Sequence, residues 1–244
     1  MKSNTLLNIF LLFSLICGFS CELIAEVSWK QSLIKEEASH LAQLPHLKFT
    51  VPNDKICASH EKGFEKIFKD QYIYALVEKK SSLVGSQKPH LTIQVCGLVE
   101  APMRFTHQVL SQYDQYSEIT DHIKSSEWHI KKKSLFLHAE ALGYHSFMLV
   151  KTFPVQWHHG VAILDQQVTA GTMRDLMARI VLQDHGRRKT IVRLLIEYEY
   201  TQLPIPELFI ESGFKLVFRQ MAAALRGHVE KKYDRARHEK KVKL

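Results

Sequence analysis

The sequence predicts an α+β fold in which an antiparallel sheet comes first and one long helix comes last. The clearest strand is Lys189–Tyr200, where apolar and charged residues alternate as in a sheet with one buried and one wet face. Ser134–Ala141 and Tyr144–Phe153 form a hairpin across Gly143. From Pro206 onward, apolar residues recur at three- and four-residue steps, which predicts a helix with one apolar stripe. That stripe consists of Ile210, Phe214, Val217, Phe218, Met221, Leu225 and Val229.

Shorter elements are expected before and between these. Trp29–Leu44 places apolar residues near one helical face, and Glu61–Asp70 is a candidate for a second, shorter helix. Two short helices are expected after the strand that ends near Pro102, and the first is amphipathic because Phe105 and Val109 share one side of it. The remaining predicted strands are Tyr72–Val77, Leu91–Val99, His122–Lys131, Gly160–Val168 and Met173–Gln183.

The N-terminus has the pattern of a secretory signal peptide in residues 1–25. A basic Lys2 precedes an apolar run that is shorter than the roughly 20 residues of a membrane span, and small residues follow it. We therefore expect an exported protein, either periplasmic or secreted. Two alternatives remain open: lipid anchoring at Cys21, for which Gly18 is an unusual preceding residue, and a retained N-terminal anchor helix.

Composition is that of an ordinary globular chain with a basic bias. Of the 244 residues, 45% are hydrophobic and 24% are charged, and the formal net charge is +8. Much of the excess lies at the C-terminus, including the basic tail at residues 234–244. The tail suits either an anionic membrane surface or a solvated helix end. Nucleic acid is not an expected partner, because an exported protein rarely meets it.

Two cysteines lie in the body of the chain, Cys57 and Cys96. An oxidising compartment would allow a disulfide between them, which would tie the N-terminal extension to the strand before Pro102. Two buried free thiols are the alternative. No Cys-x-x-Cys pair suggests redox chemistry.

Three motifs resemble those of the START-like superfamily, also called the SRPBCC or helix-grip superfamily, in its polyketide cyclase and coenzyme Q-binding branch. They are the Val-Glu-Ala-Pro run ending at Pro102, the Gln-Tyr-Asp-Gln-Tyr run ending at Tyr116, and the close from Ile205 to Glu230. The resemblance implies a curved sheet wrapped around the C-terminal helix. It divides the chain into an extension at residues 26–88 and a helix-grip domain at residues 89–233.

The resemblance also implies non-enzymatic binding or transport of an apolar small molecule, such as a lipid, a quinone or a polyketide-like compound. A cavity between sheet and helix would hold such a ligand by removing its surface from water. The competing interpretation is that the apolar stripe simply fills a core. The predicted lining consists of Val192, Leu194, Ile196 and Tyr198 from the last strand and Phe214, Phe218 and Met221 from the helix.

No catalytic, metal-binding or cofactor-binding motif is apparent. The alternative of a cyclase/aromatase-like enzyme requires an inward polar group, for which Tyr144, His138 and Arg179 are the candidates. A protein–protein docking module is a third possibility. Glu197 and Glu199 share the expected wet face of the last strand, where Arg193 offers an ion-pair partner, so we assign them a structural role.

Overall fold

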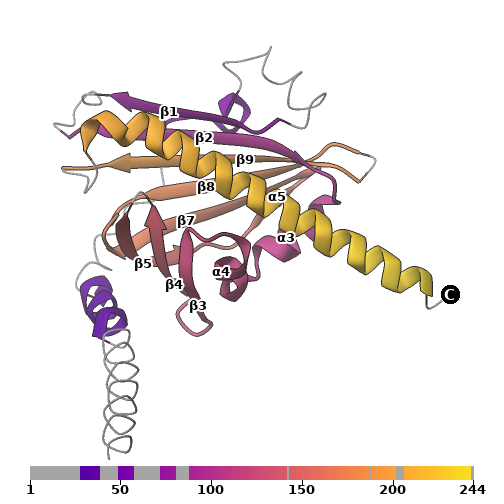
Figure 1. The fold of residues 1–244 in the computed structure, drawn as a ribbon, viewed down its shortest axis with the longest axis horizontal. Helices are drawn as coiled ribbons and strands as arrows, with labels where there is room; N and C mark the ends of the chain where they lie inside the picture. The colour runs from indigo at the N-terminus through magenta and orange to yellow at the C-terminus, as the bar shows by residue number, and fades with distance from the viewer. Residues whose placement is uncertain are drawn as a thin grey trace, which may run out of the picture.

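A curved antiparallel sheet of nine strands forms the body of the computed structural model (Figure 1). The structure describes residues 28–38, 49–57, 72–80, 88–141, 143–186, 188–201 and 206–242. The strands pair in the order β1-β2-β9-β8-β7-β5-β4-β3, with β6 pairing to β7 alone. Their bounds are β1 Tyr74–Lys80, β2 His90–Val99, β3 Ile123–His129, β4 Ser134–Ala141, β5 Tyr144–Thr152, β6 Gln156–His158, β7 Val161–Gly171, β8 Met177–Asp184 and β9 Thr190–Glu199.

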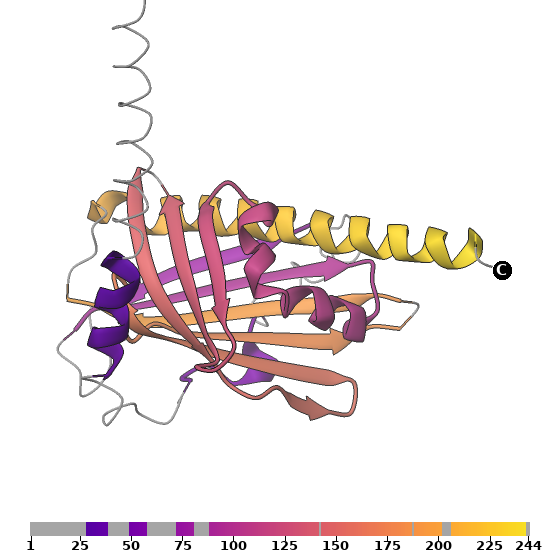
Figure 2. The same cartoon turned by 90° about the horizontal axis from the view of Figure 1, so that it is seen from below.

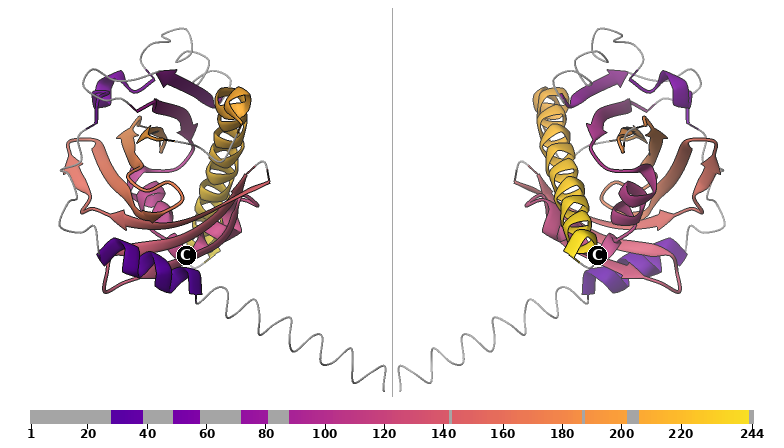
Figure 3. Two further views of the ribbon diagram at one scale, coloured as in Figure 1. Left: turned by 90° about the vertical axis from the view of Figure 1, so that its left-hand side faces the viewer. Right: turned by 90° about the vertical axis from the view of Figure 1, so that its right-hand side faces the viewer.

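The long helix α5, Ile210–Val242, lies across the open side of this sheet (Figure 3). Pro206 precedes a short 3-10 turn, η4 (Glu207–Phe209), and the α-helix begins only after it. Phe214 packs with the inner residues of β1, β2 and β9, and Val229 packs with Val99 of β2 and with Val109 in the following helix. The predicted α+β fold with a curved sheet around a C-terminal helix is therefore confirmed.

Three short elements join β2 to β3: α3 (Met103–Leu110), η3 (Tyr113–Gln115) and α4 (Tyr116–Ile119). Pro102 precedes α3 because its fixed φ suits a helix start and it has no N–H to lose. Asp114 accepts a hydrogen bond from the backbone N–H of Trp128, which ties η3 to β3. These elements cover one end of the concave face (Figure 2).

The convex face of β9 is covered by residues 49–57, which we call the strap. The strap contains the turn η2 (Asn53–Lys55), and a disulfide joins its last residue, Cys57, to Cys96 of β2. Its Ile56 is fully buried against Leu195. Burial of this apolar surface stabilises the strap on the sheet.

The strap overturns the prediction that the charged face of the last strand is wet. Glu197 is only 1% exposed, and its carboxylate accepts hydrogen bonds from the backbone N–H groups of Thr50 and Val51 at 3.0–3.2 Å. On the same face, Arg193 donates a hydrogen bond to the side-chain oxygen of Gln183 at 2.7 Å. Desolvation lowers the pKa of the Arg193 guanidinium.

A helical segment at residues 28–38 covers a second part of the convex face. Leu33 packs with Phe136 and Leu149, and Trp29 lies with its ring 5.1 Å from that of Phe147. This segment matches the described part of the predicted helix Trp29–Leu44. The predicted signal peptide, Cys21 and the helix Glu61–Asp70 lie outside the described residues.

The predicted strands match the observed ones closely, with two differences. β8 begins at Met177 rather than Met173, because residues 172–176 form a turn in which Asp175 has a φ of 73° and its N–H bonds to Val168. The short strand β6 was not predicted, since three exposed residues show no periodicity. None of the described helices combines the length and the hydrophobicity that crossing a membrane requires.

Candidate functional site: an apolar cavity under the C-terminal helix

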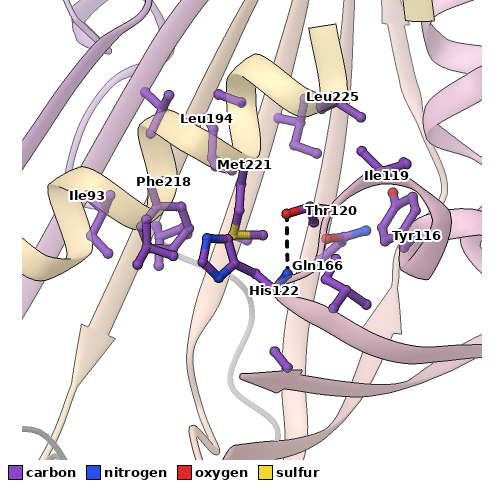
Figure 4. A pocket seen from close by; sticks show the side chains of 18 of the residues that line it. Ile93, Tyr116, Ile119, Thr120, His122, Gln166, Leu194, Phe218, Met221 and Leu225 are labelled. Atoms are coloured by element: carbon purple, nitrogen blue, oxygen red, sulfur yellow. Dashed lines mark hydrogen bonds between the residues drawn. The ribbon is translucent and has the colours of Figure 1, made fainter. Parts of the chain in front are cut away.

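A cavity of about 340 Å³ lies between the concave face of the sheet and α5. Its wall is formed mostly by aliphatic and aromatic side chains from the strands, with α5 as the roof; Figure 4 shows Ile93, Leu194 and Phe218 among them. This volume is within the range of small-molecule sites, and predominantly apolar walls are typical of them. The arrangement can hold one apolar molecule by removing its surface from water.

Small residues and sheet curvature keep this space from filling. Ala139, Ala178 and Ala222 line the cavity where larger side chains would project into it. The pairing of β5 with β7 shifts register between Leu149 and Val150, and such irregularities bend a strand. The sheet thus curves away from α5 instead of packing flat against it.

All seven residues predicted to line a cavity lie at its wall in the structure. They are Val192, Leu194, Ile196 and Tyr198 from β9 and Phe214, Phe218 and Met221 from α5. Because β9 alternates strictly, its even-numbered residues share the concave face. Contact of these side chains with a ligand remains a prediction, and Phe214 and Phe218 also pack against the inner core.

The cavity also contains polar side chains that the sequence did not reveal. Tyr116, Thr120, His122 and Gln166 line it, from α4, the link to β3, and β7 (Figure 4). The Tyr116 hydroxyl donates to the Leu110 carbonyl at 2.6 Å, and desolvation raises the pKa of this phenol. Only Tyr116 belonged to a motif recognised in the sequence, and no spacing signal distinguishes the other three.

One family model matches residues 99–226, which is more than half of the chain. It describes polyketide cyclase / dehydrase and lipid transport proteins. The chain belongs to this family. Membership of this family leads us to expect hydrophobic-ligand binding or polyketide cyclase-like activity. No curated protein sequence matches the chain significantly.

Several solved structures are similar to this chain at low sequence identity. The STAR-related lipid transfer protein of Xanthomonas axonopodis is 11% identical, covering 64% of this chain and 93% of its own, with a TM-score of 0.51. A START superfamily protein from Mycobacterium smegmatis is 16% identical, covering 57% and 97%, with a TM-score of 0.47. The Zhui aromatase/cyclase from Streptomyces sp. R1128 is 14% identical, covering 60% and 94%, with a TM-score of 0.45. At 11% identity, the similarity to the Xanthomonas axonopodis protein concerns the fold alone.

The polar residues considered for a cyclase-like site do not meet in the cavity of this family member. Arg179 lies on the convex face, where it makes two hydrogen bonds of 2.7 and 2.8 Å to Asp165 and one of 3.0 Å to Asn53 of the strap. His138 stacks on Phe147, also on the convex side. Tyr144 packs against the inner core but does not line the cavity.

Clusters of three potential metal ligands are absent from the part of the chain that the structure describes. Within it, no three His, Cys, Asp or Glu side chains lie close enough together to hold an ion. His138 and His145 approach each other at 3.1 Å between ring nitrogens, which is a hydrogen-bond distance. These two histidines are therefore assigned a structural contact.

Proposed function

We propose that the protein is a non-enzymatic carrier that binds one apolar small molecule, such as a lipid, a quinone or a polyketide-like compound, in the cavity beneath α5. The observation that carries this proposal is the cavity itself, whose wall is apolar apart from a few side chains. A core that served stability alone would be filled, because protein interiors pack to the density of organic crystals. Export of the carrier, inferred from the N-terminal pattern, belongs to the same proposal.

A cyclase-like enzyme is the second candidate, favoured by the presence of His122 and Tyr116 in the cavity lining. The Tyr116 hydroxyl is already bonded to a backbone carbonyl, and the desolvation that raises its pKa favours the neutral phenol. A catalytic acid or base needs a pKa near the working pH. The carrier function therefore agrees better with the geometry.

Native mass spectrometry of the protein purified from a membrane-containing host, followed by organic extraction, tests the carrier proposal. We expect one co-purifying apolar molecule per chain, or uptake of one from lipids and quinones offered in vitro. An empty protein that takes up neither would reject the proposal and favour a docking role. Recovery of a chemically altered molecule would favour the enzyme.

Narrowing the cavity should abolish binding without unfolding the protein. In Phe218→Trp the larger side chain enters the cavity, and we expect uptake of a neutral fluorescent apolar probe, N-phenylnaphthylamine, to fall at least about tenfold, the equivalent of 1.4 kcal/mol. Leu216→Trp is the matched control, because Leu216 lies on the same helix and is 53% exposed. Equal uptake by both variants, each melting cooperatively, would place the ligand elsewhere.

We also propose that the basic tail lets the carrier approach an anionic membrane. Tyr233 is within 5.1 Å of Phe105, ring to ring, and α5 then continues through residues 234–242, which is about 13 Å of helix at 1.5 Å per residue. Figure 2 shows this end of α5 running past the sheet. Residues 234–244 hold five basic and two acidic residues, and Arg235 and Arg237 are exposed.

Vesicle sedimentation tests the membrane contact. Replacing Arg235 and Arg237 with Gln should weaken binding to anionic vesicles by about tenfold or more, since each basic residue near such a surface contributes about 1 kcal/mol. The same replacement of Lys131 and Lys132, exposed in the turn between β3 and β4, is the control. Unchanged vesicle binding after replacement of Arg235 and Arg237 would show that the tail does not contribute to membrane contact.

A further inference from the structure

The cavity wall is mostly apolar but includes a few polar side chains, which restrict the ligands that it can accept. We name Thr120, His122 and Gln166 the head-group site, because all three line the cavity with groups able to form hydrogen bonds (Figure 4). The wall formed by Leu91, Ile93 and other residues of β2 and β9 is largely aliphatic. A ligand that uses both regions has an apolar body and one polar end.

His122 is the residue whose hydrogen bonds define this site. Its Nδ1 lies 3.2 Å from the backbone carbonyl oxygen of Glu140, and its Nε2 lies 3.1 Å from the side-chain amide of Gln220 on α5. A carbonyl oxygen can only accept, so Nδ1 carries the hydrogen and donates it. Neutral imidazole then leaves Nε2 as an acceptor, which the –NH₂ end of the Gln220 amide satisfies once its two ends are interchanged.

The acceptor at Nε2 distinguishes between polar ends of a ligand. A hydroxyl can donate to Nε2 and replace Gln220, which is exposed and can return to water. A carboxylate has no hydrogen to donate, so its oxygens would face the Nε2 lone pair. A hydrocarbon end would leave Nε2 without a partner when it displaced Gln220, which costs the desolvation of that group.

Charged groups near the cavity carry both signs. The Glu140 carboxylate is paired with Lys124 at 3.3 Å, and Asp121, next to His122, is exposed. Arg226 lines the cavity and has an interaction of its own within the protein. Selectivity between a hydroxyl and a carboxylate therefore depends on the acceptor at Nε2.

Gln166 supplies a second, uncharged contact. Its side chain lines the cavity from β7. An amide has two donor hydrogens and an acceptor oxygen, so it can form a hydrogen bond with a ligand hydroxyl. Thr120 is held close by, where its hydroxyl accepts from the His122 backbone N–H at 3.4 Å.

We propose that His122 makes this cavity selective for apolar molecules that carry a hydroxyl at one end, over the corresponding carboxylic acids and hydrocarbons. The ligand class is thus an apolar alcohol, with a chain or fused-ring body. This inference rests on the proposed carrier function, because it concerns the same cavity.

Displacement of N-phenylnaphthylamine by a matched series tests the selectivity. The series is a saturated fatty alcohol, the fatty acid and the alkane of equal chain length, measured at neutral pH. We expect the alcohol to compete about tenfold better than the acid, the scale of one buried hydrogen bond and the lost partner. Equal competition by alcohol and acid, or stronger competition by the acid, would overturn the inference and leave the carrier function standing.

Two variants assign the selectivity to the imidazole. His122→Phe keeps a ring of similar size without nitrogens, so the alcohol preference should fall to within about twofold while probe affinity is retained. His145→Phe, on the exposed side of β5, should keep the full preference. A preference that survives in His122→Phe would overturn the role of His122. Failure of the wild-type protein to bind the probe at all would instead remove the carrier function itself.

Discussion

The two faces of β9 lie in opposite environments although their residues alternate along one strand. On the concave side, Leu194 and Ile196 line a cavity. On the convex side, Leu195 is fully buried and packs with Ile56 and Cys57 of the strap. One face therefore meets a space and the other meets a second layer of protein.

We therefore expect stability to depend mainly on the convex face of the sheet and ligand binding on the concave face. The convex side holds the disulfide, the buried Glu197 carboxylate and the Arg179–Asp165 pair. The concave side contributes less packing, because part of its apolar surface faces the cavity. Substitutions on the convex face should change the free energy of unfolding, and those on the concave face should change affinity.

The largest effect should come from the disulfide. Replacing both Cys57 and Cys96 with Ala opens a loop of 39 residues, which the chain-entropy model values at about 4 kcal/mol of unfolding free energy. Chemical denaturation measures the loss, and probe affinity under native conditions should change less than about twofold. A large fall in affinity would show that the two faces are coupled.

Replacing the buried Glu197 should lower the free energy of unfolding by less than removing the disulfide does. Glu197→Ala removes the acceptor of the Thr50 and Val51 N–H groups. Because hydrogen bonds to a charged group are stronger than neutral ones, we expect the free energy of unfolding to fall by about 3 kcal/mol. Glu199→Ala, two residues along and exposed, is the control and should cost less than about 0.5 kcal/mol. Similar losses in both variants would mean that the strap is not held by Glu197.

Leu194 and Leu195 are neighbours on β9 but lie on opposite faces of the sheet, so the same substitution can be compared on each face. Leu195→Ala creates a void in filled core and should cost about 2 to 3 kcal/mol, with probe affinity unchanged. Leu194→Ala only enlarges an existing space and should cost about 1 kcal/mol while altering probe affinity. Denaturation and probe titration of the pair measure both quantities; a reversed pattern would reverse the assignment of the faces.

Periodicity was sufficient to predict most of the fold. The alternation in Lys189–Tyr200 and the stripe from Ile210 to Val229 correspond to β9 and α5. Periodicity assigns residues to faces but does not say what covers a face. The burial of Glu197 depends on Thr50, which is 147 residues away and carries no local signal for the contact.

For the cavity, too, periodicity predicted some of the lining residues and missed others. Its apolar wall follows from which residues share a face, so Leu194 and Phe218 could be predicted from the sequence. His122, Thr120 and Gln166 could not, because each is a single polar residue whose orientation depends on the end of α4 or on the curvature of β7. Arg179 and His138 were considered as inward groups and lie on the convex face instead.

The strap can dock fully only after β9, which lies far along the chain, has been synthesised. In a chain that emerges N-terminus first, Thr50 must wait for Glu197, whereas Cys57 needs only Cys96, 39 residues later. Contacts so distant in sequence form slowly, because closing a long loop costs entropy before any contact rewards it. Until the strap docks, the apolar back of β9 around Leu195 is open to other chains, which makes this late closure the stage at which the protein is most exposed to aggregation.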